Sequence, residues 1–121
     1  MKQRIAILSD IHGNTTALKA VLADAKELEA TEYWLLGDLF LPGPGGNDLM
    51  DLLEGLPIAV AVRGNWDDCV LEASDGVYGL EDPQEVQLLR LTQYLMERLD
   101  TRYIDWLRSL PLLDKIEVDG L

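Results

Sequence analysis

Cysteine is scarce in this sequence, and basic residues are few compared with acidic ones. Cys69 is the only cysteine among 121 residues, which excludes an internal disulfide and fits the reducing cytoplasm, where we expect the protein to act. Ten Lys and Arg face twenty-two Asp and Glu, giving a formal net charge of −12. Because such a surface repels phosphate backbones, we expect no nucleic-acid-binding patch and favour metal cations as charged partners, although most of the acids serve only solubility.

Long hydrophobic runs are also missing. No segment approaches the roughly 20 apolar residues that a transmembrane helix needs, so we expect no membrane association. The apolar run after the basic N-terminus covers only Ile5–Leu8, which is too short for the hydrophobic part of a signal peptide. Apolar residues nevertheless make up 48% of the chain, enough to build a core, and no linker divides it. We therefore expect one domain over residues 1–121.

The stretch Arg4–Ala17, with the sequence RIAILSDIHGNTTA, organises the chain. Its apolar run Ile5–Leu8 predicts a central strand that is buried on both faces. Asp10 and His12, the only histidine of the protein, follow directly after this run. Apolar residues then recur at three- and four-residue spacings, which predicts an amphipathic helix over residues 15–29. An acid and an imidazole are therefore expected side by side in a turn at a strand end.

Two further strands end in the same way. Tyr33–Leu36 is predicted to be a strand that stops just before Asp38, and Ile58–Val62 one that runs toward Asn65. Helices are expected between the strands, and this alternation predicts an α/β fold with a mostly parallel sheet and helices on its face. Because ligands of such sheets lie beyond the carboxyl ends of the strands, we expect Asp38 and Asn65 to meet the residues of the first turn.

A loop over residues 75–79, two helices and a short strand are predicted in the second half. Asp82-Pro83 is typical of a helix start, and a shorter helix follows the one that begins there. Alternation over Lys115–Val118 predicts a half-buried strand, and Asp119-Gly120 after it is a strong hairpin signal. No returning strand follows, so we expect a truncated domain that lacks its C-terminal half. A terminal edge strand with a frayed tail is the alternative.

The polar residues at the strand ends form a mixed set of oxygen and nitrogen donors: Asp10, His12, Asp38 and Asn65. Each alone is most often a solvated turn or a helix cap, so an ordinary α/β domain with polar turns is one alternative. Together, two carboxylates, a carboxamide and an imidazole suit divalent metals such as manganese, iron or zinc. A cation would also remove the repulsion between the two carboxylates. We therefore predict a metal site at this edge.

Three blocks, Ser9–Asn14, Leu36–Asp38 and Arg63–Asp67, resemble the first three motifs of the calcineurin-like metallophosphoesterases, in outline D-x-H, G-D and G-N-x-D/E. The resemblance covers about the first seventy residues and is closest to the compact bacterial phosphodiesterase-like branch. It implies a four-layer α/β/β/α sandwich with two divalent metals at the strand ends. Nickel and magnesium are alternatives to manganese, iron and zinc.

The same resemblance implies the chemistry of the site. Asp10 and His12 would bind the first metal, Asp38 would bridge both metals, and Asn65 would bind the second. Asp38 and Asn65 are thus the predicted catalytic positions. A metal-bridging hydroxide would hydrolyse a small phosphate mono- or diester, because bound metals lower the pKa of water and neutralise the phosphoryl charge.

The sequence departs from the family pattern at two points. Many members carry a histidine where Trp66 stands, and an indole cannot supply a titrating proton to the leaving group. The family also completes its metals with three further histidines, whereas none follows His12. We expect these to lie beyond Leu121 and the 121-residue chain itself to be weak or inactive. A non-catalytic metal- or anion-binding interaction module is the alternative. The sequence carries no pattern that specifies the substrate or the oligomeric state.

Overall fold

The computed structural model describes residues 2–76 and 82–121, which contain one parallel sheet and five helices. The strands are β1 (Ile5–Leu8), β2 (Glu32–Leu35) and β3 (Ile58–Ala61), in the order β1-β2-β3. The helices are α1 (Thr15–Glu27), α2 (Asn47–Leu53), α3 (Asn65–Ser74), α4 (Pro83–Met96) and α5 (Thr101–Ser109). Strands and helices alternate up to α3, which confirms the predicted α/β class with a parallel sheet and helices on its face.

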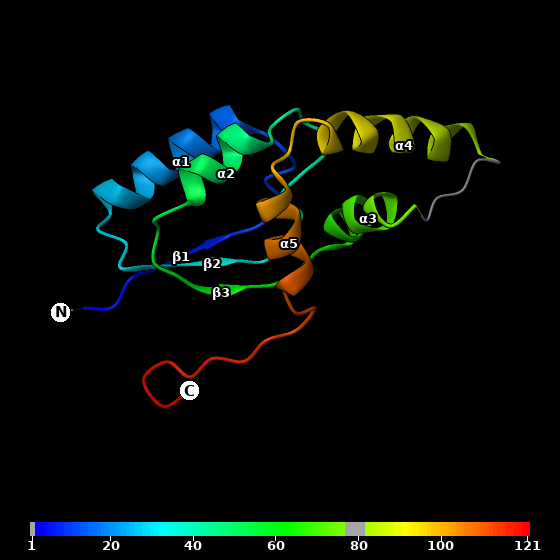
Figure 1. Ribbon diagram of the computed structural model, residues 1–121. Coiled ribbons are helices and arrows are strands. Elements are labelled where there is room, and N and C mark those ends of the chain that lie inside the picture. Colours follow the sequence, from blue (N-terminus) through cyan, green and yellow to red (C-terminus); the bar gives the residue numbers. More distant parts are fainter. Residues whose placement is uncertain (1, 77–81) are drawn as a thin grey trace.

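The helices are distributed unevenly around the sheet (Figure 1). α1 and α2 lie side by side over one face, while α3, α4 and α5 gather near the end where the strands terminate. The core between sheet and helices contains fully or almost fully buried Leu35, Phe40, Leu49 and Leu107. None of the described helices combines the length and the apolarity that a membrane span needs. Loops, helix starts and core therefore meet at the carboxyl ends of the strands.

β1 is not the central strand that the sequence predicts, because β2 lies between β1 and β3. Its side chains are not buried on both faces either, since Ile7 is 55% exposed. The reason is that the described helices above β1 cover one face of the sheet only (Figure 1). The apolar run thus identifies the strand correctly, but the position in the sheet depends on what packs against it.

The other predicted boundaries lie close to the observed ones. β2 and β3 each end one residue earlier than predicted, at Leu35 and Ala61. α1 begins where predicted, and the side chain of Asn14 caps it by accepting a first-turn amide at 3.0 Å. α4 begins after Asp82, whose carboxylate accepts a first-turn amide at 2.9 Å. The predicted loop over residues 75–79 lies partly outside the described residues.

The C-terminal segment does not form the predicted strand, because residues 115–118 pair with no other strand of the described chain. The predicted turn does form. Val118 and Leu121 exchange N–H···O hydrogen bonds of 3.0 and 2.9 Å around Asp119 and Gly120. Both central residues have positive φ, 49° and 83°, as two-residue hairpin turns of this kind require. Alternation gives residues 115–118 a strand pattern, but a strand also needs a neighbour.

Candidate metal centre

Each strand of the sheet delivers polar side chains to the same edge. Asp10 and His12 follow β1, Asp38 follows β2, and Asn65 follows β3 as the first residue of α3. One donor atom from each of Asp10, His12 and Asp38 lies within 4.8 Å of the other two. The fold therefore brings together residues that are far apart in the sequence, as expected for the carboxyl ends of parallel strands.

The loops after β1 and β2 are joined through their backbones. The His12 amide donates to the Asp38 carbonyl oxygen at 2.9 Å, and the Gly13 amide donates to that of Leu39 at 2.8 Å. Asp10, His12 and Asp38 all have positive φ, between 51° and 57°, which is uncommon for residues with a side chain. Hydrogen bonds between the two loops hold these residues in that conformation, so the side chains leave the backbone in fixed directions.

Glycines allow these segments to approach. Gly13 and Gly43 lie so close that a Cβ on Gly13 would be 2.3 Å from the Gly43 carbonyl oxygen. A Cβ on Gly37 would lie 2.6 Å from the Gly64 nitrogen. The glycine before Asp38 and the glycine before Asn65 are therefore required by the same backbone contact, which explains their place in the two motifs.

Both ring nitrogens of His12 have defined neighbours. Nδ1 lies 2.7 Å from the carbonyl oxygen of Leu41, and Nε2 lies 3.2 Å from Asp10 Oδ1. A carbonyl oxygen only accepts, so Nδ1 carries the proton in the neutral ring and Nε2 presents a lone pair toward the carboxylate. A lone pair and a carboxylate at this distance require a proton or a cation between them. This is the orientation that a metal-binding histidine needs, with its other nitrogen fixed by a backbone carbonyl.

Asp38 and Asn65 face each other across the edge. With its nitrogen toward Asp38, the Asn65 carboxamide donates to both carboxylate oxygens at 3.2 Å. In the opposite orientation, the carboxamide oxygen of Asn65 faces the carboxylate oxygens of Asp38, and no proton lies between them. Such an arrangement is stable only around a cation. Asp38 Oδ1 also accepts the Trp66 amide at 3.0 Å. Together with the donors of Asp10 and His12, this set fits a divalent metal.

Asp67 is fully buried beneath this edge. Its carboxylate accepts three amide hydrogen bonds, from Asp38 at 2.8 Å and from Leu39 and Gly64 at 3.0 Å each. Burial raises the pKa of Asp67, and the three N–H donors oppose that rise. Two sequence signals point to Asp67: it stands three residues after Gly64, where helix-capping carboxylates occur, and it is the acidic residue of the G-N-x-D/E block. The contacts with the loop after β2 have no such signal.

Comparison with known proteins identifies the family. The family model described as calcineurin-like phosphoesterase matches residues 3–121. The chain belongs to this family. This confirms the resemblance seen in the three sequence blocks.

The chain is also similar to individual proteins of known structure or sequence. The crystal structure of a metallophosphoesterase from Sphaerobacter thermophilus superposes with a TM-score of 0.67 at 32% identity, over 92% of this chain and 42% of that chain. An uncharacterized protein of Methanocaldococcus jannaschii is 39% identical over 99% of this chain and 47% of its own length. A symmetrical bis(5'-nucleosyl)-tetraphosphatase of Serratia proteamaculans is 33% identical over 88% of this chain and 37% of its own length. The chain thus spans less than half of each of these proteins.

Trp66 occupies the position at which many calcineurin-like phosphoesterases carry histidine. Its ring meets that of His12 edge-on, with centroids 5.7 Å apart and planes at 82°. The side chain is partly buried and packs against the core. Trp66 therefore supports the imidazole from the side and, as a donor only, supplies no titrating proton.

Ser9 holds the carboxylate of Asp10. The Ser9 hydroxyl donates to Asp10 Oδ2 at 2.8 Å, and this bond holds the pKa of Asp10 below its usual range. The side chain of Asp10 remains 65% exposed, so it is open to solvent and to a ligand.

A groove opens beside the two donors of the first turn. It has a volume of 670 Å³, and its lining includes Asp10, His12, Asn14, Pro42 and Asp48. The Gly46 amide donates to Asp48 at 2.9 Å and holds the pKa of that carboxyl below its usual range. The groove therefore has a second carboxylate in its lining besides that of Asp10.

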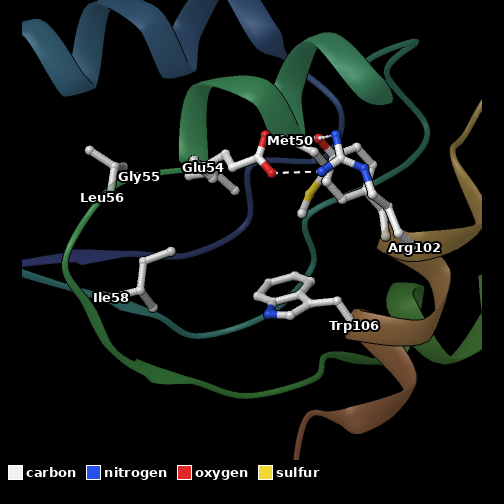
Figure 2. A pocket seen from close by; sticks show the side chains of 9 residues that line it. Met50, Glu54, Gly55, Leu56, Ile58, Arg102 and Trp106 are labelled. Carbon is white, nitrogen blue, oxygen red and sulfur yellow. Dashed lines mark hydrogen bonds and ion pairs between the residues drawn. The ribbon is translucent and has the colours of Figure 1, made fainter.

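A second hollow, of 310 Å³, lies near the start of β3 (Figure 2). Ile58 and Trp106 contribute apolar walls, and an ion pair of 2.7 Å between Arg102 and Glu54 lies at its rim. None of the metal-site candidates lines it. It is thus separate from the edge at the carboxyl ends of the strands.

Proposed function

We propose that this chain supplies the catalytic edge of a dinuclear metal-dependent phosphoesterase that hydrolyses a small phosphate mono- or diester. The observation that carries the proposal is the convergence of donor atoms from Asp10, His12 and Asp38 within 4.8 Å at the carboxyl ends of the strands. The family to which the chain belongs supports phosphoester hydrolysis as the reaction class.

In this proposal Asp10 and His12 would hold the first metal, Asp38 would be shared by both metals, and Asn65 would hold the second through its carboxamide oxygen. The mixed donor set favours manganese, iron or zinc, with nickel and magnesium as alternatives. When bound, the two cations supply Lewis acidity and lower the pKa of a water molecule. Asp38 and Asn65 are the catalytic positions in this proposal, Asp38 as the residue shared by both metals and Asn65 as the ligand of the second.

The residues of the chain contribute rigid orientation. The Leu41 carbonyl fixes the tautomer of His12, and the Trp66 amide fixes Asp38 Oδ1. The groove beside Asp10 offers space for the ester substituent of the substrate. Since Asp48 also lines this groove, an uncharged substituent is accommodated better there than an anionic one.

We further propose that the chain is the N-terminal part of a longer domain in which histidines outside this sequence complete the metal sites. Two observations support this: the chain covers only 37% to 47% of the lengths of the two sequence relatives, and it contains a single histidine. On its own the chain is then weakly active or inactive. A cytoplasmic location is part of the same proposal, with which the free Cys69 is compatible.

An assay of the longest natural form of the protein tests the proposal. An aryl phosphate and an aryl phosphodiester are each incubated with and without Mn²⁺, and the Asp38→Asn variant is run in parallel. We expect metal-dependent turnover that the substitution abolishes, because the bridging carboxylate is lost. Turnover that needs no metal, or that Asp38→Asn leaves unchanged, would contradict the proposal.

A non-catalytic module that binds one metal or an anion is the second candidate. The presence of one histidine, with at most three donors for one metal and two for the other, is the observation that favours it. Calorimetric titration of the longest natural form with Mn²⁺ separates the two. The phosphoesterase should bind two ions, whereas the module should bind one or none.

A further inference from the structure

We infer that Asp67 is a positioning residue that sets the distance and direction between Asp38 and Asn65. This inference rests on the proposed metal centre. Asp67 is not itself a candidate metal ligand, because its carboxylate oxygens accept hydrogen bonds from backbone amides. These amides belong to the two loops that carry Asp38 and Asn65.

The contacts of Asp67 exceed what helix capping requires. A carboxylate at the third position of α3 needs only the amide of Gly64, which Oδ2 accepts at 3.0 Å. The same oxygen also accepts the amide of Asp38 at 2.8 Å, and Oδ1 accepts that of Leu39 at 3.0 Å. These two donors belong to the loop after β2, so Asp67 joins that loop to the start of α3.

The side chain of Asp38 in turn binds the backbone of α3. Its Oδ1 accepts the amide of Trp66, in the first turn of α3, at 3.0 Å. The carboxylate of Asp67 therefore binds the backbone of the loop that carries Asp38, and the carboxylate of Asp38 binds the backbone of the helix that carries Asp67. Together the two connections fix both the distance and the relative rotation of the two segments. The contact between Gly37 and Gly64 leaves no space in which the loops could slide closer.

The chemistry of the contact explains why a carboxylate is needed. An ionised carboxylate only accepts, so it can face three N–H groups at once without an opposing donor. An asparagine in the same place keeps one oxygen but turns an NH₂ group toward one of the amides. Asp67→Asn should therefore displace one loop relative to the other while the apolar core is kept.

The experiment measures Mn²⁺ binding to the longest natural form of the protein by calorimetry and by electron paramagnetic resonance of free Mn²⁺. Wild type, Asp67→Asn, Asp38→Asn and a matched control, Thr92→Val, are compared. Thr92 is 1% exposed and its hydroxyl donates to the Leu88 carbonyl oxygen at 2.8 Å, so its loss also removes a buried hydrogen bond, but in α4. Circular dichroism and the thermal midpoint report folding, and trimethylamine N-oxide is added to all samples if Asp67→Asn is partly unfolded.

We expect Asp67→Asn to weaken Mn²⁺ binding by about 10- to 100-fold, the range typical of residues that orient metal ligands. Thr92→Val should lower the thermal midpoint but bind Mn²⁺ as wild type does. Binding by Asp67→Asn within twofold of wild type would overturn the inference. An equal loss of Mn²⁺ affinity in Thr92→Val, at a thermal midpoint similar to that of Asp67→Asn, would also overturn it. The loss of affinity would then follow from lower stability alone. If Asp38→Asn binds Mn²⁺ normally, the proposed metal centre itself is wrong, and the role of Asp67 fails with it.

Discussion

The backbones of Gly37 and Gly64 lie in direct contact, since a Cβ on Gly37 would be 2.6 Å from the Gly64 nitrogen. Gly64 is equally close to Asp38, because a Cβ on Gly64 would lie 2.2 Å from Asp38 Oδ1. The loops after β2 and β3 thus meet at a distance that only glycine permits. A methyl group on Gly64 must push the candidate bridging carboxylate away, and one on Gly37 must push the backbone of Gly64 away.

Replacing Gly64 by alanine tests this contact. The φ of Gly64 is −96°, so alanine brings no backbone strain there, and only the collision with Asp38 remains. We expect a loss of about 1–3 kcal/mol in the free energy of unfolding, typical of overpacking, together with weakened Mn²⁺ binding.

Gly76→Ala is the control for the Gly64 variant. It introduces strain at φ +77° but meets no atom within 4 Å. It should cost about 1–2 kcal/mol and leave metal binding unchanged. Urea denaturation and Mn²⁺ titration measure both effects. Normal metal binding by Gly64→Ala would contradict the prediction.

The hydroxyl of Ser9 should control the ionisation of Asp10. Its hydrogen bond is the main cause of the lowered pKa of Asp10, so Ser9→Ala should move that pKa upward toward the ordinary value of 3.8. A depressed pKa contributes stability that is present above the unfolded value and is lost as the pH falls through the folded value. In Ser9→Ala the contribution of Asp10 to stability should be smaller than in wild type, and it should be lost at a higher pH as the solution is acidified.

Carbon-13 NMR titration of the metal-free protein measures the pKa of Asp10 directly. Ser109→Ala removes a hydroxyl that donates to the Trp106 carbonyl oxygen and serves as the control. An unchanged pKa of Asp10 in Ser9→Ala would show that the hydroxyl has no such effect.

Arg63 should hold the end of α5 against the loop after β3. Its amide donates to the Pro111 carbonyl oxygen at 2.9 Å, while its guanidinium donates to that of Leu110 at 3.1 Å and to Asp68 at 2.6 Å. Arg63→Ala removes the guanidinium contacts, and we expect a loss of about 1.5–3 kcal/mol, as for hydrogen bonds of charged groups. Amide hydrogen exchange at Leu110 should accelerate.

The control for Arg63 is Arg98→Ala. Arg98 is an exposed residue whose closest carboxylate oxygen, from Glu97, is 3.8 Å away. Its loss should cost less than about 1 kcal/mol. Equal losses of stability in the two variants would refute the anchoring role of Arg63.

Tyr103 should ionise only at high pH. Burial, assisted by the hydrogen bond that its hydroxyl donates to Asp51 at 2.8 Å, raises the pKa of Tyr103 to about 12. Because the unfolded value is 10, the stability is complete below pH 10 and is lost as the pH rises from 10 to about 12. Tyr103→Phe should remove this alkaline loss and the last phase of the tyrosinate absorbance titration. Tyr94→Phe should keep that phase, and its disappearance there would point to Tyr94 instead.

The convergence of the polar residues that follow the strands could be predicted because it follows from two simple rules. Apolar runs mark strands, and the carboxyl ends of parallel strands meet at one edge. Asp10, Asp38 and Asn65 each stand directly after such a run, so their convergence needs no knowledge of the loops. The position of β1 could not be predicted in this way, because it depends on which elements cover the sheet.

The residues that orient the donors were harder to predict, for a physical reason. His12 is held by the carbonyl oxygen of Leu41, and Asp67 binds the amides of Asp38 and Leu39. Backbone groups are present in every residue, so the sequence does not mark which of them a side chain will meet. The C-terminal strand was predicted wrongly for a related reason, since alternation does not specify a pairing partner.

Asp38 is followed directly by three of the most deeply buried residues of the chain. Leu39, Phe40 and Leu41 are only 1%, 0% and 3% exposed, and the backbone groups of Leu39 and Leu41 hold the first turn. The backbone that carries His12 and Asp38 is therefore anchored to the core. Much of its conformational entropy is lost when the chain folds, so less remains to be lost when a ligand arrives. Ligand affinity and folding stability are thus thermodynamically linked, so a cavity made at Phe40 would also weaken the binding of a metal ion.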